Sequence, residues 1–259
     1  MKKRLVFLCL FAALSVCFCF VADAASCLNW YTTRNKAHKQ ALAAPELRFV
    51  ENYGGYYIDH NHGDDDADRV IYLTFDAGYE NGNVEKILDT LQATQTAGAF
   101  FVLKHFVTAN GDLVERMQKE GHLICNHTAS HKNLSSSNAE EIKYELEALE
   151  EAVREATGQK CAPYFRPPEG SFSEEMLKSV QSLGYKTIFW SFAYADWDND
   201  KQMAPDAALE RILAHVHNGA VLLLHPTSAT NAAILGKLIE TLRTQGYRFG
   251  TLDELCGIK

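Results

Sequence analysis

Five ionisable side chains stand at or just beyond the ends of apolar runs that are typical of buried strands. A carboxylate can accept a proton from water, an imidazole with a near-neutral pKa can return one to a leaving group, and a guanidinium can fix a carboxylate in one rotamer. Hydrolysis by an activated water molecule requires these parts. One such residue at a strand end would be an accident, whereas five indicate a site. They are Asp76, His127, Arg166, Asp196 and His225.

The stretch NHTASHKNL places two histidines, His127 and His131, four residues apart. If this segment turns helically, both imidazoles share one face and can bind a single divalent cation, with water at the open positions. The alternative interpretation is two exposed polar histidines in a loop, and the spacing alone does not separate the two. The pair is therefore a candidate metal site.

The other candidates also have structural interpretations. Asp76 could be a turn or helix-cap residue, Arg166 a surface arginine, and His225 a buried, hydrogen-bonded histidine. Asp196 and Trp197 could be a helix cap and a core aromatic residue, or else a carboxylate partner for Arg166 and a ring on which a sugar stacks. In the functional interpretation, Asp76 suits a general base and His225 suits a general acid for an amine leaving group.

Strand-like and helix-like segments alternate about seven times from Val70 onward. The clearest helix is predicted at 138–157, where Ser137 and Glu140 match a capping box and Gly158 follows the end. Strands that are apolar on both faces and alternate with helices predict a parallel α/β sheet or barrel, with functional groups at the carboxyl ends of the strands. The expected strands are 70–75, 98–103, 122–126, 162–165, 186–192, 219–224 and 246–250, and the other expected helices are 83–95, 111–120, 173–183, 205–217 and 229–245.

Residues 1–24 have the order of a secretory signal peptide. Basic residues come first, an apolar run extends from Leu5 to Val21, and small residues surround the expected cleavage site after Ala24. The apolar run is short for a membrane anchor, so we expect export with cleavage. Residues 25–69 are irregular and predict an N-terminal wrap, and residues 70–259 form the expected catalytic domain.

The composition excludes several classes of partner and site. A formal net charge of −8 is a poor match for nucleic acid or an anionic lipid surface. No C-x-x-C pair occurs beyond the signal peptide, which excludes a zinc ribbon. The cysteines that remain are Cys27, Cys125, Cys161 and Cys256, and their pairing stays open.

Five stretches occur in a fixed order along the chain: TFDAGYENG, NHTASH, RPPEGSFS, FWSFAYADWD and AVLLLH. Each is weak alone, but together they resemble the five motifs of the polysaccharide deacetylases, the family 4 carbohydrate esterases with the NodB-homology fold. The resemblance covers roughly residues 52–256. Within the family, the chain looks most similar to the peptidoglycan de-N-acetylases that act in muramic δ-lactam formation in bacterial spore cortex.

The resemblance implies a distorted (β/α) barrel of about seven parallel strands and a hydrolase that removes acetyl groups from N-acetylated sugars. It also implies a bound divalent metal ion, for which zinc is the first expectation. The roles implied are Asp76 as base, His127 and His131 as metal ligands, Arg166 as the residue that orients Asp76, Asp196 as the partner of Arg166, His225 as general acid, and Trp197, Leu223 and Tyr79 as substrate contacts, with Leu223 beside the acetyl methyl group.

The sequence departs from the family pattern at two positions. Most of the family has Asp-Asp-Gly where this chain has Asp76-Ala77-Gly78, so the carboxylate that would be a third metal ligand is missing. The δ-lactam subgroup is similar in lacking it. Glu169 stands where that subgroup often has a basic residue, which bears on contact with an acidic substrate group such as a lactyl carboxylate.

The function that these observations favour is de-N-acetylation of N-acetylmuramic acid in a peptidoglycan glycan strand by a monomeric enzyme outside the cytoplasm. One alternative is a deacetylase of N-acetylglucosamine polymers or chitooligosaccharides. Another is a wall-binding family member without catalysis. Retention of base, acid and ligands together argues against the second alternative, because binding alone requires none of them.

Overall fold

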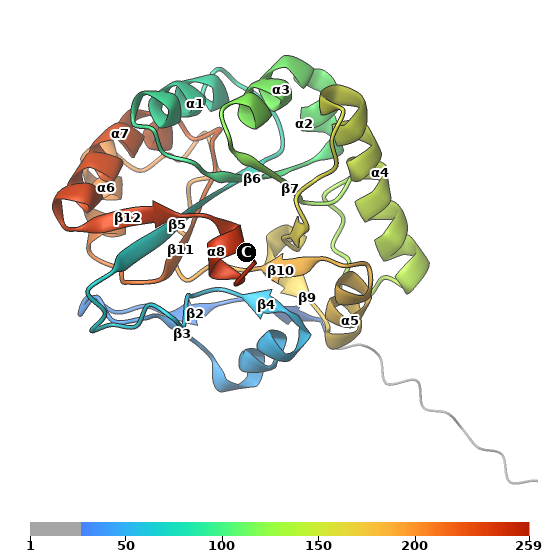
Figure 1. The fold of residues 1–259 in the computed structure, drawn as a ribbon, viewed down its shortest axis with the longest axis horizontal. Coiled ribbons are helices and arrows are strands. Elements are labelled where there is room, and N and C mark those ends of the chain that lie inside the picture. Colours follow the sequence, from blue (N-terminus) through green and yellow to red (C-terminus); the bar gives the residue numbers. More distant parts are fainter. Residues whose placement is uncertain (1–26, 259) are drawn as a thin grey trace, which may run out of the picture.

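The computed structural model describes residues 27–258, so the predicted signal peptide and its cleavage site lie outside the described residues. Its main sheet curves into a barrel in the order β11, β5, β6, β7, β8, β10 and β4, and β12 pairs with the first half of β5 (Figure 1). All ladders within this sheet are parallel, which confirms the predicted α/β barrel. The strands are β4 (Gly55–Tyr56), β5 (Arg69–Ala77), β6 (Ala99–Val102), β7 (Leu123–Asn126), β8 (Tyr164–Phe165), β10 (Lys186–Ile188), β11 (Ala220–Leu224) and β12 (Tyr247–Gly250).

Helices surround the outer face of this sheet on most sides (Figure 1). Most bury an apolar stripe, as amphipathic helices over a parallel sheet do, whereas α8 buries Leu252 and Leu255 among the residues of the barrel interior. None of the helices within residues 27–258 combines the length and apolar character needed to span a membrane. The helices are α1 (Val84–Ala93), α2 (Lys104–Ala109), α3 (Gly111–Lys119), α4 (Ala139–Thr157), α5 (Glu174–Ser182), α6 (Pro205–Leu213), α7 (Ala229–Thr244) and α8 (Leu252–Leu255).

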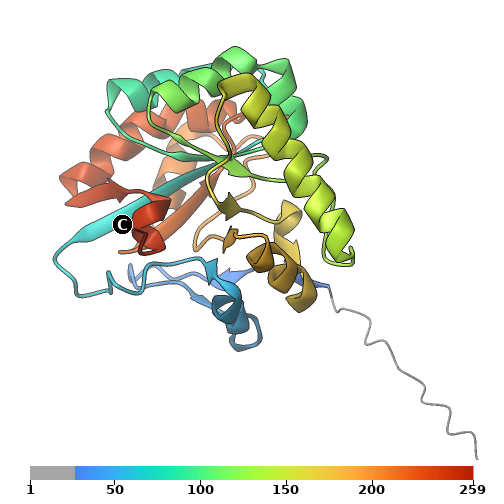
Figure 2. The ribbon, with the colours of Figure 1, turned by 45° about the vertical axis from the view of Figure 1, so that its right-hand side comes forward.

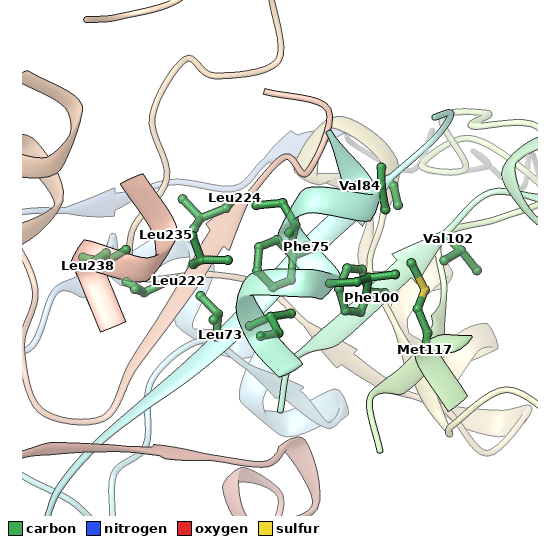
Figure 3. Close-up of a cluster of buried hydrophobic side chains, with 14 of the residues drawn as sticks. Leu73, Phe75, Val84, Phe100, Val102, Met117, Leu222, Leu224, Leu235 and Leu238 are labelled. Atoms are coloured by element: carbon green, nitrogen blue, oxygen red, sulfur yellow. The ribbon is translucent and has the colours of Figure 1, made fainter. Parts of the chain in front are cut away.

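Alternation along β5 sends its side chains into two different apolar layers. Phe75 lies on the outer face, where its ring stacks on Phe100 at 4.8 Å beneath the helices (Figure 3). Tyr72 lies on the inner face and packs with Phe101 in the barrel interior. Because successive strand residues point to opposite faces, Asp76 shares the inner face with Tyr72. The strand therefore delivers its carboxylate to the inside of the barrel.

Single bridges, not a ladder, close the barrel between its two edge strands. Ile58, just after β4, bridges Ala220 of β11, and Phe192, beyond β10, bridges Leu222. The predicted strand 186–192 therefore ends early, at Ile188. Residues 189–192 cross the seam between the edge strands β4 and β11. Phe189 N–H donates to the Tyr56 carbonyl of β4, and Ser191 N–H donates to the Val221 carbonyl of β11.

The sequence also misplaced helix ends: the predicted helix 205–217 ends at Leu213 as α6, and the start of α4 differs from the predicted one. The N-cap of α4 is Asn138, whose side chain accepts a hydrogen bond from Glu141 N–H at 3.0 Å, so the predicted capping box of Ser137 and Glu140 is wrong by one residue. Gly158 ends the helix in the left-handed conformation, as expected.

The segment before β5 lies along the side of the barrel opposite the large helices (Figures 1 and 2). It contains β1 (Leu28–Asn29), which pairs with β9 (Ser171–Phe172), the pair β2 (Thr32–Thr33) and β3 (Leu42–Ala43), and the 3-10 helix η1 (Pro45–Tyr53). Trp30 stacks on Phe189 at 4.3 Å and donates to the Trp190 carbonyl at 2.9 Å. These contacts anchor the segment over the barrel seam.

A buried carboxylate, Asp59, fixes the end of this segment to the barrel. It accepts hydrogen bonds from the Tyr72 hydroxyl and from His62 Nδ1 at 2.7 Å. On its other side His62 lies 3.2 Å from Asp68, which in turn pairs with Arg248. Burial lowers the pKa of His62, but the bonds and charges of Asp59 and Asp68 outweigh it, so the net pKa is raised. The protonated imidazole therefore stabilises the fold.

We expect His62→Ala to lower the free energy of unfolding by about 1–3 kcal/mol at pH 6, because Asp59 loses a buried partner. A raised pKa contributes stability that is complete below the ordinary value near 6.5 and is lost as the pH rises through the folded-state value. Urea unfolding of both proteins should show a smaller difference at pH 8.5 than at pH 6. The exposed neighbour His60→Ala is the control, and a difference independent of pH would contradict this role of the charged form.

Candidate active site

Four parallel strands end at one rim of the barrel, and each brings a candidate residue there. Asp76 lies near the end of β5, and the other three directly follow their strands: His127 after β7, Arg166 after β8 and His225 after β11. Asp196 reaches the same rim from the chain beyond β10, because it contacts His225. The structure thus brings the five sequence-predicted ionisable residues to one end of the barrel.

Arg166 is completely buried, and each of its three guanidinium nitrogens donates a hydrogen bond. Nη1 donates to Asp76 Oδ1 at 2.7 Å, Nη2 to Thr74 Oγ1 at 2.9 Å, and Nε to the Ile188 carbonyl at 3.0 Å. One face of the guanidinium lies over the Phe101 ring at 4.1 Å. The arginine is therefore an internal scaffold for the Asp76 carboxylate.

The charge of Arg166 determines the protonation state of Asp76. Burial alone would raise the pKa of this carboxyl, but the Arg166 guanidinium and, to a lesser extent, His127 and His225 outweigh it and lower the pKa. Asp76 is consequently ionised at neutral pH and able to accept a proton.

Asp196 does not contact Arg166, so the predicted pairing of these two residues is wrong. The donors of Arg166 are occupied by Asp76, Thr74 and backbone carbonyls. Asp196 turns to His225 instead, where Oδ1 accepts from Nδ1 at 2.7 Å and Oδ2 accepts from the backbone N–H at 2.9 Å. Burial lowers the pKa of His225, but Asp196 outweighs this effect and raises it overall.

Sequence reasoning missed the residue that fixes Asp196. Asn231 Nδ2 donates to Asp196 Oδ2 at 2.6 Å and to the His225 carbonyl at 3.0 Å, and the Tyr194 hydroxyl donates to the Asn231 side-chain oxygen. Asn231 lies in the first turn of α7, next to the N-cap Ser228, and is fully buried. A buried amide needs hydrogen-bond partners, and the polar stretch SATN at the start of α7 is the signal for it in the sequence.

The two candidate metal ligands lie side by side. The rings of His127 and His131 are 5.1 Å apart at 69°. His127 Nδ1 is 2.8 Å from the Arg166 carbonyl, which can only accept, so this nitrogen carries the proton. Nε2 is therefore left with a free lone pair, the state in which a histidine binds a metal.

The buried Nε2 of His127 points at another acceptor, because Asp76 Oδ2 is 3.6 Å away. Burial is the main cause that lowers the pKa of His127 to about 4, so the imidazole is neutral at pH 7. Two lone-pair atoms this close repel unless a cation or a proton donor lies between or beside them. This donor set fits a divalent cation on the two imidazoles. Within residues 27–258, no group of three or more His, Cys, Asp or Glu side chains is placed to bind a metal.

The two departures from the family pattern have distinct structural settings. Ala77 is fully buried in the apolar cluster beneath the helices, on the face of β5 opposite Asp76. Glu169 is exposed, has φ of 61°, and lies 3.5 Å from Asn133 Nδ2. Asn133 is two residues beyond His131, so Glu169 places a negative charge on the histidine side of the rim.

The three predicted substrate contacts lie on β11 and in the loops that follow β5 and β10. The Trp197 ring is 60% exposed and lies edge-on to His225 with centroids 6.1 Å apart. Tyr79 is also exposed, and its hydroxyl accepts a hydrogen bond from Asn199, which links the loops after β5 and β10. Leu223 pairs in register with Thr74, and alternation along β11 places it on the inner face.

Residues 63–188 match the family described as polysaccharide deacetylase. The chain is 39% identical over 229 residues to the peptidoglycan-N-acetylmuramic acid deacetylase PdaA of Bacillus subtilis, with 88% of this chain and 85% of the relative covered. The solved structure of that protein, a family 4 carbohydrate esterase, superposes with a TM-score of 0.83 over 88% of this chain and 96% of that one.

Two proteins of Bacillus anthracis show the range among similar structures. A family 4 carbohydrate esterase is 37% identical with a TM-score of 0.71, covering 88% of this chain and all of that one. A family 4 pseudoenzyme is 27% identical with a TM-score of 0.71, covering 79% of this chain and 69% of that one. The barrel is therefore shared by proteins with and without activity.

Asp196→Asn should lower the pKa of His225, because the amide removes the negative charge and keeps only one of the two acceptor oxygens. The pKa is measured from the pH dependence of the His225 ring signals by NMR. Asp200→Asn, an exposed change in the same loop, should leave these signals unaltered. An unchanged titration in Asp196→Asn would show that Asp196 does not set the protonation of His225.

Proposed function

Because this chain belongs to the polysaccharide deacetylase family, whose active members hydrolyse the amide bonds of N-acetylated sugars, we propose that it removes the acetyl group from N-acetylmuramic acid residues of peptidoglycan. The observation that carries the proposal is the presence, at one rim, of two separate charged pairs: Asp76 with Arg166, and His225 with Asp196. The pKa of Asp76 is lowered and that of His225 is raised, as a base and an acid acting together require.

Asp76 acts as the general base in this proposal. Its Oδ1 is fixed by Arg166, which leaves Oδ2 directed to the side of His127. From there the ionised carboxylate accepts a proton from the water that attacks the acetyl carbonyl carbon. The lowered pKa keeps the base ionised at neutral pH, although it also makes the carboxylate a weaker base.

His225 acts as the general acid. Asp196 accepts from Nδ1, so Nε2 carries the second proton of the imidazolium and donates it to the sugar nitrogen as the C–N bond breaks. The products are acetate and a free amine. Without this proton the leaving group would be an amide anion, which is far too basic to depart unaided.

His127 and His131 would bind the divalent ion, with zinc as the first expectation. When bound, that ion supplies Lewis-acid polarisation of the acetyl carbonyl. His127 is already fixed by the Arg166 carbonyl, so the residue that orients the base also orients a ligand through its backbone. This coupling makes the base and the ligand parts of one rigid unit.

We propose the muramic sugar as the substrate on the basis of the similarity to PdaA. Trp197 provides an exposed ring on which a sugar can stack, and Leu223 an apolar surface for the acetyl methyl group. Formation of muramic δ-lactam in spore cortex would follow from this specificity. Relatives named as peptidoglycan-N-acetylglucosamine deacetylases are 33% identical over 74% of this chain, so the glucosamine sugar is the competing substrate.

The remaining proposals concern the setting of the enzyme. We propose that residues 1–24 direct export, that residues 25–69 wrap the barrel, and that residues 70–259 form the catalytic domain of a monomer acting outside the cytoplasm. The charge of −8 disfavours nucleic acid as the partner.

Asp76→Asn is expected to reduce acetate release by about a hundredfold or more, because the amide cannot accept the proton. The assay supplies divalent metal and glycan strands with or without stem peptides, and mass spectrometry then identifies which sugar has lost 42 Da, the mass of a ketene unit. Asp200→Asn is the matched control. Wild-type protein that releases no acetate under any of these conditions would favour a non-catalytic wall-binding protein, and deacetylated glucosamine would assign the competing substrate.

A further inference from the structure

We propose that Glu145 of α4 is a positioning residue that fixes His131 beside His127 by binding the turn between them. This inference rests on the proposed role of the two histidines in metal binding. Glu145 is 7% exposed, and its carboxylate reaches out of the helix to the chain that follows β7. Its hydrogen bonds go to Ala129 and Ser130 and not to either histidine, so its effect passes through the backbone.

The turn that carries His131 has an unfavourable backbone conformation. Thr128 has φ of 74° and His131 has φ of 59°, both in the left-handed region that favours glycine. A β-branched residue such as Thr128 is rare there, and each such residue costs roughly 1–3 kcal/mol. The turn persists only if surrounding contacts stabilise it.

Those contacts account for every backbone N–H from residue 128 to residue 131. The N–H of Thr128 donates to Asn126 Oδ1, and that of His131 donates to Thr128 Oγ1, both at 2.9 Å. The other two bind Glu145: Ala129 N–H donates to its backbone carbonyl at 3.1 Å, and Ser130 N–H to its Oε2 at 2.9 Å. The Ser130 hydroxyl donates to the second carboxylate oxygen at 2.8 Å.

A buried carboxylate at position 145 costs desolvation free energy unless its hydrogen bonds stabilise the turn. α4 buries apolar residues on the same face, and an apolar side chain at this position would fill the space without desolvating a charge. Instead the buried carboxylate has both oxygens bound to Ser130. Packing alone would favour an apolar residue at this position of α4. The charged residue is explained by its hydrogen bonds, which fix the turn.

The two histidines depend on different supports. His127 is fixed by its own contacts, from its N–H to the Val102 carbonyl at 3.2 Å and from Nδ1 to the Arg166 carbonyl at 2.8 Å. His131 has its N–H bound within the turn that Glu145 supports. Loss of the Glu145 carboxylate should thus release His131 while His127 and Asp76 stay in place.

The test measures Zn²⁺ affinity of purified, metal-stripped protein by calorimetry. Glu145→Ala should bind Zn²⁺ about 10–100-fold more weakly than wild type, the range for loss of a residue that orients a metal ligand. Glu145→Gln should recover affinity to within about threefold, because its oxygen accepts from Ser130 N–H and its amide donates to the hydroxyl. Glu147→Ala, an exposed change on the same helix, should bind as wild type does.

Thermal unfolding of each variant in the presence of chelator shows whether weaker Zn²⁺ binding is accompanied by lower stability of the metal-free fold. This comparison separates a positioning role from a general effect on stability. If Glu145→Ala fails to fold, Ser130→Ala replaces it, since that variant loses one hydrogen bond at the turn and should still bind Zn²⁺ severalfold more weakly. Wild-type affinity in Glu145→Ala, or in Ser130→Ala where that variant is used, would overturn the positioning role and leave the metal site intact. A wild-type protein that binds no Zn²⁺ would overturn the two-histidine site and the inference with it.

Discussion

The site depends on one buried cation, the Arg166 guanidinium. A charge removed from water destabilises a fold unless it is paired and hydrogen-bonded. The partners of Arg166 here are Asp76 and Thr74 of β5, the carbonyl of Ile188 at the end of β10, and the ring of Phe101. The carbonyl of the same residue binds His127. Arg166 thus connects β5, β6 and β10, keeps Asp76 ionised and orients His127, a candidate metal ligand. The charge of Asp76 and the orientation of His127 therefore cannot vary independently.

The second charged pair centres on His225, which follows β11, the strand that pairs with β5 in the sheet. Asp196 binds His225 twice, and Asn231 at the start of α7 binds both. The loops after β5 and β11 are joined as well, since Asn81 and Asn83 both donate to the Thr227 carbonyl. Asp76 and His225, the proposed base and acid, are therefore supported by different residues, and hydrogen bonds join the loops that follow their two strands.

The sequence predicted the barrel and the rim residues because both follow from local patterns. Strands that are apolar on both faces alternate with amphipathic helices, and catalytic and binding residues lie at the carboxyl ends of parallel strands. The hydrogen-bond partners of the rim residues were predicted poorly, because they depend on the directions of side chains from elements that are distant in the sequence. Asp196 was assigned to Arg166, yet it lies beside His225. Asn231 and Glu145 were overlooked, since their sites form only when α7 and α4 pack on the barrel. Closure through Ile58 and Ala220 is likewise a contact between remote segments.

The central claim is that Arg166 keeps a buried Asp76 ionised as the base. It is tested most directly by carbon-13 NMR of the aspartate carboxyl groups, with Asp76 assigned by its absence in Asp76→Asn. The account predicts that Asp76 remains ionised at pH 5, with a pKa below the ordinary value of about 3.9, and that Arg166→Gln raises this pKa. An Asp76 carboxyl that is protonated at pH 5 in the wild-type protein, or that titrates identically without the guanidinium, would contradict it.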